Sequence, residues 1–129
     1  MDQNKGAGPL KRICGKIGSR VEFTYSHYSV QGKVRGVLLD RVAERSLGIR
    51  RPERFFNVID LIKFDVNGKE TRVIRFGYYA HRNGRLTWAN RPLTDPIAEL
   101  QKLFKSAYNH CGPDGTFWFK EFIEGCRGN

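Results

Sequence analysis

The chain has 129 residues, of which 40% are hydrophobic and 12% aromatic, so it is long enough to bury one core and we expect a folded protein. Its 23 basic and 13 acidic residues leave a formal net charge of +10, which favours a polyanionic partner such as nucleic acid. No apolar run reaches the roughly 18 residues of a membrane span, and residues 1–9 lack the apolar core of a signal peptide, so we expect a cytoplasmic protein with no membrane partner.

The positive charge is concentrated in the first half of the chain. Residues 1–56 hold 12 basic and 5 acidic residues, residues 57–90 hold 6 and 3, and residues 91–129 hold 5 and 5. This layout predicts one surface that faces a polyanion and one neutral surface for packing or self-association. The alternative is that the charge only keeps the protein soluble.

Residues 1–9, with two glycines and a proline, predict a flexible arm before a single globular domain over residues 10–129. The apolar residues between 10 and 17 have helical spacing, which predicts one or two turns of helix. Apolar and polar residues alternate over residues 21–25, which predicts a half-buried strand. Residues 33–42 predict a second strand, bent at Gly36, and the two strands form the first hairpin.

The stretch from Gly18 to Asp40 contains a short helical turn, Val-x-Phe, a turn and then Gly-Lys-Val-x-Gly-Val-Leu-Leu-Asp. This stretch resembles the opening of the Sm-like small β-barrels, which implies a partly open barrel. Residues 73–77, Val-Ile-Arg-Phe-Gly, are similar to the later Sm signature but carry an extra residue between Arg75 and Gly77. No uracil-binding residue is therefore transferred from that family.

Residues 43–56 predict a long loop, with one helical turn over residues 41–47, because Pro52 prevents a long regular element. The loop is rich in arginine, whose planar fork donates two hydrogen bonds at once and suits phosphate. The alternative is that these arginines pair with nearby carboxylates in solvent. The arginines are Arg45, Arg50, Arg51 and Arg54, and the carboxylates are those of Asp40, Glu44 and Glu53.

Residues 57–90 predict a three-stranded antiparallel meander, because Asn67-Gly68 and Asn83-Gly84 each lie between runs of β-forming residues. A two-residue turn sets the pairing of its strands. The first turn places Asp60 opposite Arg75, and the second places Tyr79 opposite Trp88.

Residues 94–96, Thr-Asp-Pro, predict the start of an amphipathic helix with an apolar stripe from Ile97 to Tyr108. Residues 117–123 fit either a short helix or an edge strand, and their spacing favours the helix. The aromatic residues near this terminus indicate either closure of the core or a homodimer surface. The fold class is thus α+β and mostly antiparallel, with a small five-stranded twisted sheet or an Sm-like partly open barrel and a C-terminal amphipathic helix.

No GxSxG, HExxH, GxxxxGK[ST] or GxGxxG motif is present, so we expect no enzyme of those classes and no cofactor. Catalysis by a less common arrangement stays open, with His27 and His81 as the acid–base candidates. We expect no metal site, because His110, Cys111 and Cys126 lack a fourth ligand and zinc-like spacing.

The leading hypothesis is a non-enzymatic module that binds single-stranded RNA or DNA. Phosphates would contact the arginines, and bases would stack on sheet aromatics, including Tyr25 or Tyr28. The alternatives are a protein-interaction domain, and a ligand-binding barrel whose pocket is lined by Tyr79, Trp88 and Gly77. A competing interpretation places Tyr79 and Trp88 in the core. The candidate nucleic-acid-binding residues are Arg41, Arg45, Arg50, Arg51, Arg54, Arg75, Tyr79, His81 and Trp88.

Overall fold

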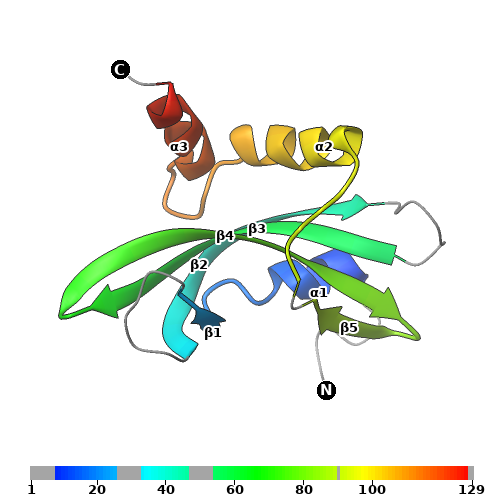
Figure 1. Ribbon diagram of the computed structural model, residues 1–129, viewed down its shortest axis with the longest axis horizontal. Coiled ribbons are helices and arrows are strands. Elements are labelled where there is room, and N and C mark those ends of the chain that lie inside the picture. Colours follow the sequence, from blue (N-terminus) through cyan, green and yellow to red (C-terminus); the bar gives the residue numbers. More distant parts are fainter. Residues whose placement is uncertain (1–7, 26–32, 47–53, 90, 128–129) are drawn as a thin grey trace.

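The computed structural model describes residues 8–25, 33–46, 54–89 and 91–127. Five strands form one antiparallel sheet in which each strand pairs with its neighbours in sequence, and the sheet curls into a half-barrel (Figure 1). The predicted α+β class, the twisted antiparallel sheet and the C-terminal amphipathic helix are confirmed. The elements in chain order are α1 (Pro9–Cys14), β1 (Arg20–Thr24), β2 (Lys33–Ser46), β3 (Arg54–Val66), β4 (Lys69–Arg82), β5 (Arg85–Trp88), α2 (Ile97–Tyr108) and α3 (Trp118–Cys126).

The two Asn-Gly turns adopt the backbone that the sequence predicts. Asn67 and Asn83 have φ angles of 51° and 50°, and the glycines that follow them also have positive φ. Asparagine and glycine tolerate this left-handed region, which a type I′ turn requires at both central positions. The predicted pairings of Asp60 with Arg75 and of Tyr79 with Trp88 are therefore confirmed.

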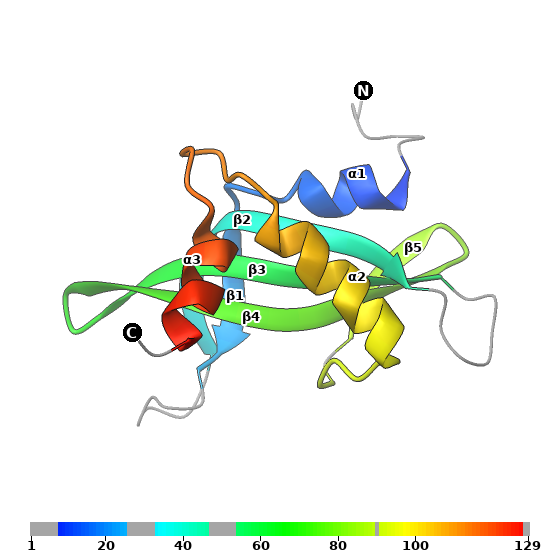
Figure 2. The same cartoon turned by 90° about the horizontal axis from the view of Figure 1, so that it is seen from above.

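Helices cover both faces of the sheet. On the face that we call the helical face, α2 and α3 lie across β2, β3 and β4 (Figures 1 and 2). The opposite, concave face, which we call the inner face, is covered at one end by α1. Val42 and Ile59 pack with Leu103 of α2 and Phe119 of α3 on the helical face. On the inner face, Ile13 of α1 belongs to a second buried cluster.

The prediction of a loop over residues 43–56 is wrong for residues 43–46 and 54–56, which lie in strands. The prediction of a helical turn is wrong for residues 41–46, which lie in β2. β2 continues to Ser46 and β3 begins at Arg54, because residues 41–46 pair with residues 55–60 in a regular ladder. Cross-strand pairing and burial on both faces of the sheet outweigh the low β-propensity of the charged residues here. Residues 47–53, and residues 1–7 of the arm predicted over residues 1–9, lie outside the described residues, and the arm prediction is wrong at Pro9, which begins α1.

The start of α2 also differs from the prediction. The residue before the helix is Pro96, and no side chain caps its first turn. Asp95 instead accepts hydrogen bonds from Ser46 Oγ at 2.5 Å and Asn57 Nδ2 at 2.7 Å, so it fastens the chain before α2 to the helical face. Among the described residues, no helix is long and apolar enough to span a bilayer.

Candidate polyanion-binding surface

A buried ion pair joins β2 to β3 on the inner face. Arg41 Nε lies 2.6 Å from Asp60 Oδ1 and Arg41 Nη2 lies 3.0 Å from Oδ2, and the two side chains are 2% and 0% exposed. Arg41 Nη1 donates to the Ile13 carbonyl and to Tyr79 Oη. Burial lowers the pKa of Arg41, but hydrogen bonding to Asp60 and the charge of Asp60 outweigh it and leave the pKa above its ordinary value. The prediction that Arg41 contacts phosphate is wrong, because its donors are used inside the protein.

A second guanidinium shares the same carboxylate. Arg75 donates from Nε at 3.1 Å and from Nη2 at 2.8 Å to Asp60 Oδ2. The guanidinium carbon of Arg75 lies 4.2 Å from the centroid of the Trp88 ring, which is a cation–π contact. Within the described part of the chain, Arg75 Nη1 has no hydrogen-bond partner. The single negative charge of Asp60 is thus shared by two guanidinium groups, so the cluster has a net positive charge. That charge reaches solvent at Arg75, whose side chain is 20% exposed.

Of the paired aromatic residues Tyr79 and Trp88, the first is buried in the core and the second is partly exposed. Tyr79 is 8% exposed and packs with Ile13, Phe56 and Val58, so its predicted role as a stacking platform is wrong. Its ring meets that of Trp88 edge to face, with centroids 5.1 Å apart. Trp88 is half-buried and fills the space that Gly77 leaves, because a Cβ on Gly77 would lie 2.2 Å from Trp88 Cη2.

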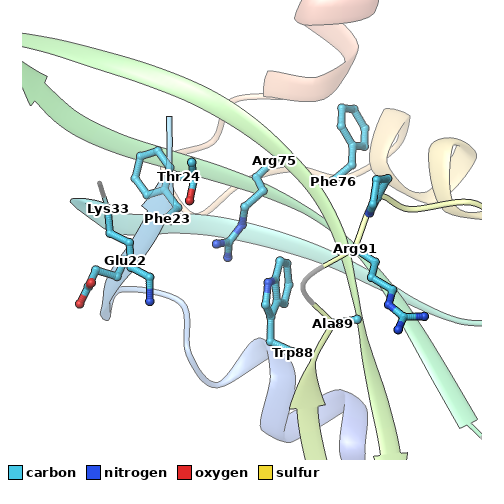
Figure 3. A pocket seen from close by; sticks show the side chains of 10 residues that line it. Glu22, Phe23, Thr24, Lys33, Arg75, Phe76, Trp88, Ala89 and Arg91 are labelled. Atoms are coloured by element: carbon cyan, nitrogen blue, oxygen red, sulfur yellow. The ribbon is translucent and has the colours of Figure 1, made fainter. Parts of the chain in front are cut away.

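Arg75 and Trp88 open into a groove between β1 and the β4–β5 hairpin, which we call the seam. The groove has a volume of about 550 Å³. In Figure 3 the Arg75 side chain extends into the space between the β1 residues and the Trp88 ring. Lys33 and Arg91 add positive charge to its rim, and Glu22 adds negative charge. The remaining residues that line it are Phe23, Thr24, Phe76, Ala89 and Pro92.

A second set of cations gathers at the end of the sheet near the β4–β5 turn, and we call it the basic end. Arg54 pairs with His81 across β3 and β4, and Arg82 pairs with Arg85 across β4 and β5. Arg45 lies opposite Phe56, which makes it a diagonal neighbour of Arg54 on the same face. From α1, Arg12 Nη1 donates to the Gly84 carbonyl at 3.1 Å. The basic end consists of Arg12, Arg45, Arg54, His81, Arg82 and Arg85.

Within the described ranges, four arginines of the basic end carry a positive charge that no ion pair neutralises. No described carboxylate forms an ion pair with Arg12, Arg45, Arg54 or Arg85. Arg45, Arg54 and Arg85 are exposed. An anion can therefore approach these four arginines without first breaking an ion pair to a described carboxylate, which makes them the candidate polyanion site.

The nine predicted residues thus separate into groups. Arg45, Arg54 and His81 meet at the basic end, and Arg75 and Trp88 meet in the seam, whereas Arg50 and Arg51 lie outside the described residues. The sequence prediction missed Arg12 and Arg85. Arg85 flanks the Asn83-Gly84 turn, so its place could have been found from the hairpin; no pattern in the sequence indicates where α1 brings Arg12.

The Asp40 carboxylate is a second buried anion of the sheet, with 1% exposure. Its Oδ2 accepts from Trp118 Nε1 at 2.7 Å and lies 2.8 Å from His110 Nε2. These contacts tie the segment between α2 and α3 to β2. They give His110 a structural role, so His110 has no need of a metal or a substrate to explain its position.

No family model, curated protein or solved structure matches this chain. Any function must therefore be inferred from the chemistry of the basic end and the seam.

Proposed function

We propose that this protein is a non-enzymatic nucleic-acid-binding module that holds the sugar–phosphate backbone at the basic end. The observation that carries the proposal is that Arg12, Arg45, Arg54 and Arg85 come from four separate elements to one end of the sheet, without an ion pair to a described carboxylate. By strand alternation Arg45 and Arg54 lie on the inner face, beside α1, and Arg85 lies on the helical face at the β4–β5 turn. Arginine binds phosphate through charge-assisted and often bidentate hydrogen bonds. We expect the cytoplasm as the location, where nucleic acid is present and thiols such as the three free cysteines stay reduced.

Two features favour a single strand over a duplex. The arginines come from a helix, two neighbouring strands and a hairpin at one end of a curled sheet. A flexible strand can follow such a surface, whereas bending duplex DNA costs energy because its persistence length is about 150 base pairs. Trp88 is half-buried and Arg75 lies over its ring, so at most one base can stack on Trp88. Phosphate contacts then dominate, and the affinity must depend strongly on salt.

The test is a titration of a labelled single-stranded oligonucleotide and of a duplex at salt concentrations from about 50 to 200 mM. For a single strand each phosphate contact contributes about −0.7 to the slope of log K against log salt, so four arginines give a slope of about −3. The double variant Arg54→Gln/Arg85→Gln should lose about half of that slope, because two of the contacts are removed.

The matched control is Lys120→Gln/Arg127→Gln, which removes two exposed cations from α3 and its end, far along the sheet from the β4–β5 turn (Figure 2). We expect this control to bind like the unmodified protein. Absence of binding at about 50 mM salt would refute the proposed function. An equal loss of slope in both double variants would show that net charge, and not the basic end, is responsible.

A further inference from the structure

One edge of β4 lacks a partner strand over much of its length. β4 spans Lys69–Arg82, but β5 pairs only with residues 79–82. Ala89 N donates to the Tyr78 carbonyl at 2.9 Å, so the backbone groups of Tyr78 point toward the β5 side. Backbone groups alternate sides along an antiparallel strand, so those of Arg72, Ile74 and Phe76 point the same way. No described strand pairs with them there, and this edge can accept a further strand.

The seam continues along this free edge. Beyond Arg75 the groove has a volume of about 660 Å³, with Phe23, Thr24 and Tyr25 of β1 on one side and residues 72–76 of β4 on the other. Phe122 of α3 also lines it. The half-barrel is thus open between β1 and β4, and its opening has the backbone of a sheet edge along one wall.

The two faces at this edge differ in chemistry. On the helical face, Phe76 and Phe122 are 40% and 43% exposed, and Phe76 stacks on Phe104 with centroids 5.7 Å apart. On the inner face, the seam presents the guanidinium of Arg75, with Lys33 and Arg91 nearby on its rim. Side chains of a strand alternate between the faces of a sheet. On the helical face Arg72 also lies at this edge, with its Nε 3.6 Å from Glu70 Oε2. A strand added beside β4 would therefore meet mainly apolar rings on the helical face and net positive charge on the inner face.

We propose that the seam binds an extended acidic peptide that adds to the β4 edge, with alternate apolar and acidic side chains. The apolar residues contact Phe76 and Phe122, and the acidic residues face Arg75 and the cations on the rim. Regular backbone donors and acceptors match a polypeptide better than they match a nucleic acid. Pairing of two β4 edges in a homodimer would instead bring the Arg75 guanidinium groups of both copies to the same inner face, which like-charge repulsion opposes. This inference does not depend on the proposed function.

The first experiment uses the full chain and a labelled synthetic peptide that alternates valine and glutamate. We expect saturable binding, with the amides of Arg72, Ile74 and Phe76 becoming protected from hydrogen exchange. A peptide with lysine in place of glutamate should bind at least tenfold more weakly, a difference of about 1.4 kcal/mol. A peptide methylated on alternate backbone nitrogens, so that it cannot donate to the edge, should lose a similar factor. If the methylated peptide binds as tightly as the unmethylated one, the proposal is overturned. This test uses the unmodified protein.

The second experiment compares Arg72→Pro with Arg72→Ala. Both variants lose the side chain, but only proline removes the outward amide, and proline is tolerated at a strand edge whose N–H faces solvent. We expect the proline variant to bind the peptide about fivefold more weakly than the alanine variant, because one hydrogen bond contributes about 1 kcal/mol. Thermal unfolding of both variants checks that the fold is kept. Equal affinities of the two folded variants would overturn the proposal.

Nucleic acid at the seam is the competing outcome. If the proposal holds, Arg54→Gln/Arg85→Gln leaves peptide binding unchanged, and a single-stranded oligonucleotide does not displace the peptide. An oligonucleotide that displaces the peptide and protects the same three amides would assign the seam to nucleic acid and overturn the peptide proposal. Failure of the peptide to bind would leave the salt titration at the basic end unaffected, so the two proposals can fail separately.

Discussion

Asp60→Asn tests whether the buried ion network stabilises the half-barrel. The substitution keeps the size of the side chain but removes the negative charge, and it leaves the guanidinium of Arg41 buried at 2% exposure without a counter-charge. Breaking a buried pair by removing one partner costs about 3 to 5 kcal/mol. A protein of this kind has a free energy of unfolding of roughly 5 to 15 kcal/mol, so the variant should lose a large part of its stability.

The measurement is urea unfolding followed by circular dichroism. With a slope of about 2 kcal/mol/M, a loss of about 4 kcal/mol lowers the unfolding midpoint by about 2 M. The control is Glu70→Gln, because Glu70 is 53% exposed and lies 3.7 Å from Lys63 and 3.6 Å from Arg72. Exposed pairs contribute at most about 1 kcal/mol. If Asp60→Asn changes the free energy of unfolding as little as the control does, the network does not stabilise the core.

Two further predictions concern the seam and the thiols. Gly77→Ala should displace Trp88, because the added Cβ would lie 2.2 Å from its ring. We expect altered tryptophan fluorescence and a loss of about 1 to 3 kcal/mol in the free energy of unfolding. The control is Gly125→Ala, where no atom lies within 4 Å of the new Cβ. Burial raises the pKa of Cys14 above 9.0, so less thiolate forms at a given pH, and Cys14 should react with a disulfide reagent more slowly than the exposed Cys126. A Cys14 thiol that reacts as fast as Cys126, as judged by mass spectrometry of the labelled peptides, would contradict this expectation.

The hairpins and their register could be predicted from the sequence because their signals are local. Asn67 and Asn83 adopt the positive φ angles of a type I′ turn, and such a turn sets every pairing on both sides of it. The opposition of Asp60 and Arg75 follows from that turn alone. The C-terminal helices could be predicted for a similar reason, since the spacing of apolar residues within each segment indicates the face that it buries.

The link between β2 and β3 could not be predicted, because no tight turn sets their pairing. Arg45 and Arg54 occur in a polar stretch that reads as a loop, yet both lie in strands that pair with each other. The burial of Arg41 depends on that pairing, which places it opposite Asp60.

The sequence by itself determined the turns, the pairing across them, the amphipathic helices and the excess of positive charge. The tertiary structure alone decided which cations reach solvent. Arg41 and Tyr79 became interior groups because α1 covers the inner face there, while Arg12 joined Arg85 because the same helix meets the β4–β5 turn. These contacts join residues far apart in the chain, and charge and periodicity within a segment carry no information about which distant segment will cover it.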